Sequence, residues 1–273
     1  MNASKSDNSF ERLSVHGTEF VVEGRGETTL VMVHGWPDTH RLWDGLVDQL
    51  KDDHRCVRFT LPGFATNHPR RLRTLEEVVG TLGAVVDTVS PDRPVTLVLH
   101  DWGCFYGYHY AMNNAKRVSR VVGFDVGDVG SKEMKLPLSM VLFTIAYQLW
   151  LAAAWVIGGR AGDAMTRRMA HVAGAPADPG LVHSGMNYGY YLKYRSILLG
   201  RPQGDVPFDP GCPMLFLYGR KKPTMFHSDA FVGRLNRTPG SRAVGFDAGH
   251  WLMLEKPDEV AAETRDWLRA PTR

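Results

Sequence analysis

Cysteine is scarce in this chain, with three in 273 residues. Three is an odd number, and Cys56, Cys104 and Cys212 fall in or beside predicted core elements, which argues against a disulfide framework or a zinc site. Glycine-rich phosphate loops and clusters of metal-ligating side chains are lacking as well. We therefore expect reduced thiols and a protein that uses no metal and no cofactor.

Long stretches of one charge sign are also absent. The net charge is +3, and Lys and Arg gather only in the short segments 69–73 and 220–222, which we interpret as solvated loops. A nucleic-acid interface needs a basic stripe, so no nucleic-acid partner is expected. The first nine residues are polar and lack the apolar core of a secretory signal, which predicts a cytoplasmic protein.

No Gly-x-Ser-x-Gly sequence occurs, which argues against the serine nucleophile of esterases and lipases. Residues 97–103 instead read Leu-Val-Leu-His-Asp-Trp-Gly. The aliphatic run 94–100 predicts a buried parallel strand, and the segment 104–118 is compatible with a helix. A sharp turn between them would lift the Asp101 side chain to the carboxyl end of the sheet.

The role of Asp101 has two interpretations. An aspartate that follows a strand often caps the next helix. Alternatively, the carboxylate is a nucleophile that needs no base to deprotonate it. Since a carboxylate is a weak nucleophile, it suits an electrophilic saturated carbon, as in an epoxide or a carbon–halogen bond.

Apolar strand patterns alternate with helical patterns along most of the chain. Such alternation predicts an α/β fold with a mostly parallel, doubly wound sheet of about eight strands and a ligand site beyond their carboxyl ends. The expected strands are 11–16, 18–23, 28–33, 55–60, 94–100, 119–126, 213–218 and 242–247, and the expected helices are near 40–51, 74–89, 103–117, 227–236 and 257–269.

Two further motifs follow predicted strands, His34-Gly35-Trp36-Pro37 and Gly249-His250-Trp251. Together with His100-Asp101-Trp102-Gly103, they resemble the α/β-hydrolase superfamily over about residues 13–268. Within it, the chain resembles the aspartate-nucleophile branch that contains epoxide hydrolases and haloalkane dehalogenases. The resemblance favours the nucleophile over the helix cap for Asp101.

The resemblance also implies roles for the other motif residues. His250 would activate water, and the backbone N–H groups of Trp36 and Trp102 would form an oxyanion hole. His34 and Pro37 would support the tight turn, in which Trp36-Pro37 is a candidate cis peptide bond.

The acid that would orient His250 is not where many members of this family carry it. They have Gly-x-x-Asp after the penultimate strand, whereas this chain has Gly219-Arg220-Lys221-Lys222. Asp125 matches an alternative position at the end of a neighbouring strand, and Asp128 is a second candidate. One of the two carboxylates should hydrogen-bond to His250.

Residues 127–210 interrupt the alternation, and a helical lid inserted at this point is common in the family that the chain resembles. We therefore expect a core formed by 1–126 and 211–273, with 127–210 as the lid. The segment 136–159 is uncharged and apolar, but its polar interruptions favour the roof of a hydrophobic pocket over membrane insertion.

In epoxide hydrolases, two lid tyrosines donate hydrogen bonds to the epoxide oxygen. Aromatic packing is the alternative role for any one tyrosine here. We expect Tyr188 and Tyr191 to act as donors, with Tyr190, Tyr194 and Tyr147 as substitutes.

The tyrosine-rich lid favours an epoxide hydrolase that acts on a small hydrophobic substrate with water. A haloalkane dehalogenase with the same triad is the main alternative, because Trp36 and Trp102 could present ring N–H groups to a halide. A non-catalytic small-molecule receptor on the same scaffold is a third interpretation. The oligomeric state stays open, a homodimer included.

Overall fold

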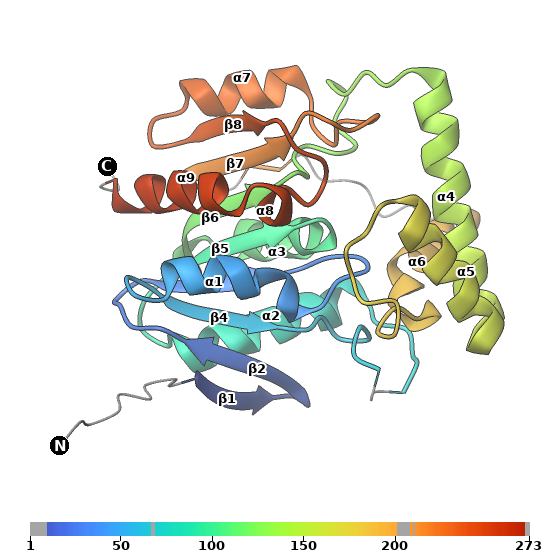
Figure 1. Ribbon diagram of the computed structural model, residues 1–273, viewed down its shortest axis with the longest axis horizontal. Helices are drawn as coiled ribbons and strands as arrows, with labels where there is room; N and C mark the ends of the chain where they lie inside the picture. The colour runs from blue at the N-terminus through green and yellow to red at the C-terminus, as the bar shows by residue number, and fades with distance from the viewer. Residues whose placement is uncertain (1–9, 67–68, 201–207, 210, 271–273) are drawn as a thin grey trace.

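An eight-stranded mixed β-sheet forms the centre of the protein, whose computed structural model describes residues 10–66, 69–200, 208–209 and 211–270 (Figure 1). The strand order is β1-β2-β4-β3-β5-β6-β7-β8. β1 and β2 form a hairpin, β2 runs antiparallel to β4, and the remaining pairs are parallel. The strands are β1 Phe10–Val15, β2 Thr18–Glu23, β3 Thr29–Val33, β4 Arg55–Phe59, β5 Val95–His100, β6 Val118–Phe124, β7 Met214–Gly219 and β8 Arg242–Phe246.

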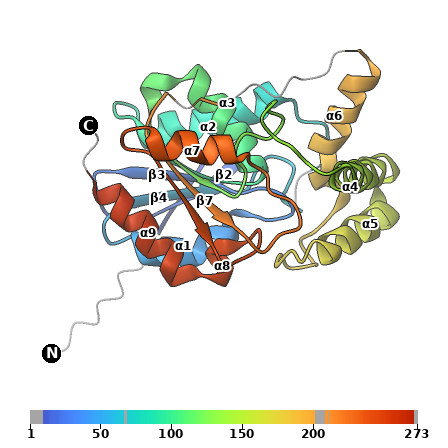
Figure 2. The ribbon, with the colours of Figure 1, turned by 90° about the horizontal axis from the view of Figure 1, so that it is seen from above.

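Helices cover both faces of this sheet, which confirms the predicted α/β architecture (Figure 2). Because β3 and β5 are buried along their whole length, their sequences are apolar without alternation. The helices α2 Leu75–Val89, α3 Trp102–Asn113 and α7 Asp229–Arg237 lie on one face, and α1 Asp44–Leu50, α8 Leu252–Glu255 and α9 Pro257–Arg269 lie on the other. The short 3₁₀ helices η1 His40–Trp43 and η2 Ala115–Arg117 precede α1 and β6.

Two predicted boundaries differ from the structure for local reasons. The helix expected over 103–117 ends at Asn113, where Asn114 Nδ2 donates to the Tyr110 carbonyl at 2.9 Å, and η2 follows. The strand expected over 119–126 ends at Phe124, because Asp125 adopts a φ of 67°. This left-handed residue turns the chain at the carboxyl edge of the sheet.

Between β6 and β7 the described residues form four helical elements beyond the carboxyl ends of the strands (Figure 1). We call them the lid helices. They are α4 Leu138–Ile157, α5 Gly159–Val172, η3 Ser184–Asn187 and α6 Tyr188–Leu198. Residues 201–207 and 210 of the expected lid segment lie outside the described residues.

We expected the apolar side chains of α4 to roof the pocket, and this helix does border the cavity through Thr144, Tyr147 and Gln148, although most of its apolar side chains do not line it. Its buried side chains, among them Leu151 and Trp155, are confined to the C-terminal half, while Leu138, Leu142 and Val156 are exposed. By length and composition this helix could cross a membrane. An apolar sequence without a polar stripe does not indicate which side of a helix faces inward.

Candidate active site

Asp101 occupies the tight turn between β5 and α3. Its φ of 53° and ψ of −122° lie in a region that residues with a Cβ rarely adopt. The neighbouring loop comes very close, since a Cβ on Gly103 would lie 2.1 Å from the Val33 carbonyl oxygen and one on Gly35 would lie 2.3 Å from Asp101 Oδ1. The glycines therefore allow the two loops to meet around the carboxylate.

The turn after β3 supplies a hydrogen-bond donor to this carboxylate. The Trp36 N–H donates to Asp101 Oδ1 at 2.6 Å, and the Trp36–Pro37 bond is cis. His34 holds the turn, because Leu61 N–H donates to its Nε2 at 2.9 Å while Nδ1 donates to the Gly35 carbonyl at 2.9 Å. Burial lowers the pKa of His34 to about 3, so the ring is neutral and serves as a brace.

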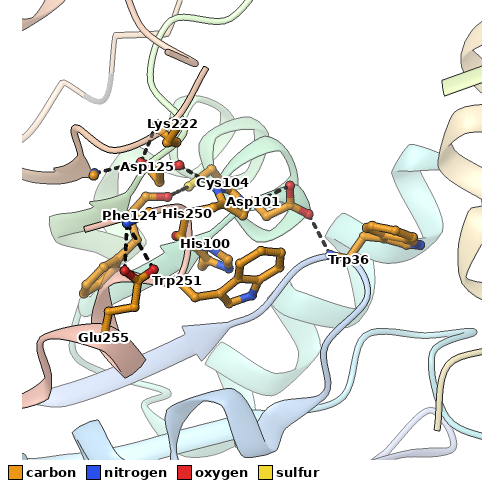
Figure 3. Close-up of polar contacts among 12 residues, drawn as sticks. Trp36, His100, Asp101, Cys104, Phe124, Asp125, Lys222, His250, Trp251 and Glu255 are labelled. Carbon is orange, nitrogen blue, oxygen red and sulfur yellow. Dashed lines mark hydrogen bonds and ion pairs between the residues drawn. The ribbon is translucent and has the colours of Figure 1, made fainter. Parts of the chain in front are cut away.

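His250 lies between two carboxylates from neighbouring strand ends (Figure 3). Its Nδ1 hydrogen-bonds to Asp125 Oδ2, and its Nε2 lies 3.6 Å from Asp101 Oδ2. On the far side, Lys222 Nζ donates to Asp125 Oδ1 at 2.6 Å, and the Gly219 N–H donates to the same oxygen at 3.0 Å. Asp125 is fully buried, so all its charge is balanced inside the protein.

Asp101, Asp125 and His250 stabilise one another's charged forms, which burial alone would disfavour. For Asp101, burial favours the neutral form, but the His250 cation and backbone N–H groups outweigh it and hold the carboxyl pKa below its usual value. For Asp125, His250 and Lys222 outweigh burial in the same way and lower the pKa. Burial lowers the pKa of His250, but Asp125 and Asp101 outweigh it and raise this pKa to about 9.

Asp128, the second candidate acid, is engaged elsewhere. Its carboxylate accepts hydrogen bonds from Ser228 N and Oγ, both at 2.7 Å, and from Ser131 Oγ at 2.7 Å. It therefore anchors the start of α7, and the structure brings Asp125 to His250 in its place. In the part of the chain that is described, no three His, Cys, Asp or Glu side chains form a group that could hold a metal ion.

A cavity of about 250 Å³ opens beside Asp101 beneath the lid helices. Aromatic side chains dominate its walls, as is usual for sites that bind small apolar molecules. Its polar lining includes the Asp101 carboxylate and several phenols, together with side chains such as Gln148 and Lys193. The aromatic walls come from α3, α4, α6 and the loop after β7, and include Trp102, Phe105, Tyr106, Tyr147, Tyr190 and Phe226.

The structure places a different pair of lid tyrosines in this cavity from the pair that we expected. Tyr147 on α4 and Tyr190 on α6 line it together, with ring centroids 6.2 Å apart. Burial raises the pKa of Tyr147 to about 12 and raises that of Tyr190 well above its usual value, so both phenols stay protonated and can donate hydrogen bonds.

The expected donors Tyr188 and Tyr191 are not among the lining residues. Tyr188 is fully buried against Phe64 and Trp155, and the Tyr191 ring stacks on Trp155 at 6.3 Å. Tyr194 donates to Gln148 at 3.2 Å in a groove on the outer side of the lid helices. The structure therefore corrects the expected site: Tyr147 and Tyr190 line the cavity, whereas Tyr188 and Tyr191 do not.

Sequence reasoning missed two polar residues that support the site. Lys222 stands where the family pattern has its acid, and a lysine in that position could have suggested a buried carboxylate partner. Asn187 in η3 accepts a hydrogen bond from Trp36 Nε1 at 2.9 Å and donates to Thr166 Oγ1 at 2.8 Å. This contact joins the lid helices to the turn that holds Asp101, and no sequence motif marked it.

Comparisons with known proteins agree with the fold. A family model described as the alpha/beta hydrolase family matches residues 30–263. A cis-3-alkyl-4-alkyloxetan-2-one decarboxylase from Shewanella oneidensis is 33% identical over an alignment that covers 91% of this chain and 84% of the relative. Epoxide hydrolase 1 from Caenorhabditis elegans is 18% identical, with 96% of this chain and 70% of the relative covered.

Solved structures of epoxide hydrolases have the same fold. One from Bacillus megaterium superposes with a TM-score of 0.73 at 17% identity, over 95% of this chain and 100% of the other. A variant of the potato enzyme superposes with a TM-score of 0.69 at 15% identity, over 96% of this chain and 99% of the other. At such identities the likeness concerns the fold and not the reaction.

Proposed function

Since this chain belongs to the α/β hydrolase family, we propose that it hydrolyses epoxides to vicinal diols through a covalent ester on Asp101. The observation that carries the proposal is the Asp101–His250–Asp125 arrangement at the base of an aromatic cavity that two lid phenols also line. A carboxylate in this position is suited to attack on saturated carbon.

In the first step, Asp101 Oδ2 attacks a ring carbon and the carbon–oxygen bond of the epoxide breaks. Oδ2 is the oxygen for this role because Oδ1 is held by the Trp36 N–H. The phenols of Tyr147 and Tyr190 hydrogen-bond to the oxygen as negative charge develops on it, and one of them supplies its proton.

In the second step, His250 removes a proton from water that attacks the ester carbonyl carbon. Esterification removes the negative charge of Asp101, so the pKa of His250 falls. The imidazolium then gives its proton to the phenolate that the first step leaves, and the neutral imidazole can act as a base. Oδ1 then carries the oxyanion against the Trp36 N–H, with the Trp102 backbone as the second donor. The bond between the carbonyl carbon and Oδ2 then breaks, and Oδ2 leaves with the product. The departing alkoxide takes the proton of the new carboxyl group, which restores the Asp101 carboxylate and leaves His250 protonated as at the start.

A second candidate reaction is the conversion of a β-lactone to an alkene and carbon dioxide, which the 33% identity to an oxetan-2-one decarboxylase favours. Attack of Asp101 on the saturated ring carbon would break its bond to oxygen and free a carboxylate. Loss of that carboxylate as carbon dioxide would form the alkene and expel Asp101. This route consumes no water.

Haloalkane dehalogenation, the alternative that the sequence left open, has less support. A halide would need ring N–H donors, and the Trp36 Nε1–H donates to the buried Asn187 amide oxygen. That leaves Trp102, whose ring packs against Tyr190 at 5.2 Å. The two phenols would also have no role in halide release.

The product distinguishes these reactions. The purified protein would be incubated with styrene oxide, 1-bromobutane and a cis-3,4-dialkyl β-lactone, and diol, halide and alkene would be measured. The proposal expects diol, and a single turnover in ¹⁸O-water should give diol that contains oxygen from the protein. Alkene alone would favour the second candidate, and absence of turnover on all three substrates would favour a receptor.

The two cavity phenols provide a matched test of the lid. Tyr147→Phe and Tyr190→Phe should each lower kcat for epoxide hydrolysis by about 100-fold, because each removes a donor to the developing alkoxide. Tyr191→Phe is the control, since this ring stacks on Trp155 outside the cavity and its loss of a hydroxyl should leave kcat unchanged. If all three variants keep the kcat of the natural protein, neither cavity phenol acts as a donor in the reaction.

The charges around His250 predict its titration. In the free protein the His250 ring should titrate near pH 9, well above the 6.5 of an isolated histidine, because its cation pairs with Asp125 and Asp101. Lys222→Met should raise this pKa further by removing a competing cation from Asp125. Asp101→Asn should lower it by removing an anion.

Ring ¹⁵N NMR, with the His250 signal assigned through His250→Gln, would measure these shifts. The raised pKa also adds stability to the fold that is fully present below pH 6.5 and is lost as the pH rises through about 9. Titration of His250 below pH 6.5 in the native protein would contradict the ion pairs.

A further inference from the structure

The outer face of α4 is apolar along its whole length. Leu138, Leu142, Ile145, Leu149 and Val156 recur at intervals of three, four or seven residues and are 72%, 57%, 41%, 46% and 65% exposed. Helices on the surface of a protein in water normally present polar side chains on this side. The twenty residues of α4 contain no charged side chain, so nothing polar compensates for the exposed stripe.

The exposed apolar surface continues onto the end of α6. Ile197 lies beside α4, where it shares a groove with Val141 and Ile145, and Leu198 is 86% exposed. We call α4 together with the end of α6 the apolar lid face. Monomeric proteins rarely leave a continuous apolar surface of this kind without a binding partner.

The groove on this face adjoins the active-site cavity. Leu136, Thr144, Gln148 and Lys193 line both the groove and the cavity. An apolar medium in contact with the lid face would therefore lie next to the aromatic-walled cavity.

The chain segment that forms the lid helices carries more positive than negative charge. Residues 132–200 contain seven Lys and Arg against three Asp and Glu, although the whole chain has a net charge of only +3. Exposed Lys132 and Lys135 precede α4, and exposed Arg160 follows it. Of the three acids, Asp163 is engaged by Ser184 N and Oγ, both at 2.7 Å.

We propose that the apolar lid face docks on the surface of a lipid bilayer that contains anionic headgroups, with α4 lying in the plane of the interface. Apolar side chains flanked by cations are the pattern of helices that bind such surfaces. This inference does not rest on the reaction proposed for the active site.

The packing of α4 favours lying on the bilayer over crossing it. Leu151, Ala154 and Trp155 are buried against the rest of the protein, and Tyr147 and Gln148 line the cavity. A spanning helix would have to withdraw these side chains and dismantle the site. A helix in the interface buries only its outer face and leaves the inner contacts intact.

The charges also favour a bilayer over a second copy of the chain. A symmetric contact between two antiparallel α4 helices would place Lys135 of one copy near Arg160 of the other. Like charges would meet at both ends, whereas anionic headgroups would neutralise them.

Sedimentation with lipid vesicles tests the proposal on the full-length protein. The protein should pellet with phosphatidylcholine vesicles that contain phosphatidylglycerol, bind pure phosphatidylcholine more weakly, and be partly released by salt. The double variant Leu142→Glu/Leu149→Glu should bind the anionic vesicles at least about tenfold more weakly, because two charges enter the apolar contact. Neither residue lines the cavity.

Phe10→Glu is the matched control, since Phe10 is an apolar residue with 50% exposure on β1, away from the lid helices (Figure 1). It should bind like the natural protein, and circular dichroism would establish that all variants fold. Hydrogen exchange in α4 should slow when anionic vesicles are present. The proposal fails if the natural protein stays in the supernatant, if the double variant binds equally well, or if sedimentation equilibrium shows a dimer that the double variant dissociates without any vesicle binding.

Discussion

Replacement of Asp101 by alanine should lower turnover by about 10⁴-fold or more, because it removes the atom that bonds to the substrate. The loss should appear in kcat for every substrate that the protein converts, since epoxide opening and β-lactone opening both begin with this carboxylate. Removal of this partly buried charge should not by itself unfold the protein, because the φ of 53° is unfavourable for aspartate and alanine alike.

Asp38 offers a matched control for this variant. It is a buried carboxyl in the same region, it accepts a hydrogen bond from Trp251 Nε1 at 2.9 Å, and burial raises its pKa to about 7. An asparagine at this position retains an acceptor for the indole, so Asp38→Asn should keep most of the activity. Substantial turnover by a folded Asp101→Ala variant would show that another residue is the nucleophile.

The sequence predicted the fold and the position of Asp101 because those features depend on local patterns. An aliphatic strand followed by a sharp turn and a helix specifies where a side chain leaves the sheet, and alternating patterns specify a parallel sheet. Asp125 could be proposed as the partner of His250 for the same reason, since neighbouring parallel strands end at one edge. Asp128 is only three residues away, and the left-handed conformation of Asp125 decides between them.

The lid was less predictable because its helices have no polar stripe that fixes their rotation. A change of two positions turns a helical side chain by about 200°, so Tyr188 and Tyr190 point in different directions although both belong to the same aromatic cluster. Tyr147 belongs to a different helix, earlier in the chain, and reaches the cavity through the packing of α4 against α6. The sequence could not predict which side of α4 is exposed for the same reason, because apolar residues occur all around this helix.

Replacement of His250 by glutamine should separate the two steps of the reaction. The variant keeps a polar side chain beside Asp125 but lacks a base, so Asp101 should still open an epoxide while hydrolysis of the ester slows by about 10³-fold. One equivalent of substrate should be consumed in a burst, and mass spectrometry of the intact protein should show the added mass of the epoxide. Peptide mapping should place that mass on Asp101.

The same variant discriminates between the two ring-opening reactions. Epoxide hydrolysis needs a base for its water, whereas β-lactone decarboxylation regenerates Asp101 by elimination and consumes no water. An ester that accumulates with styrene oxide therefore supports the hydrolytic mechanism. If the variant instead forms no ester with any substrate yet still converts a β-lactone to alkene at the natural rate, His250 is not the base of the reaction. The ion pair with Asp125 would then serve to hold the site in place.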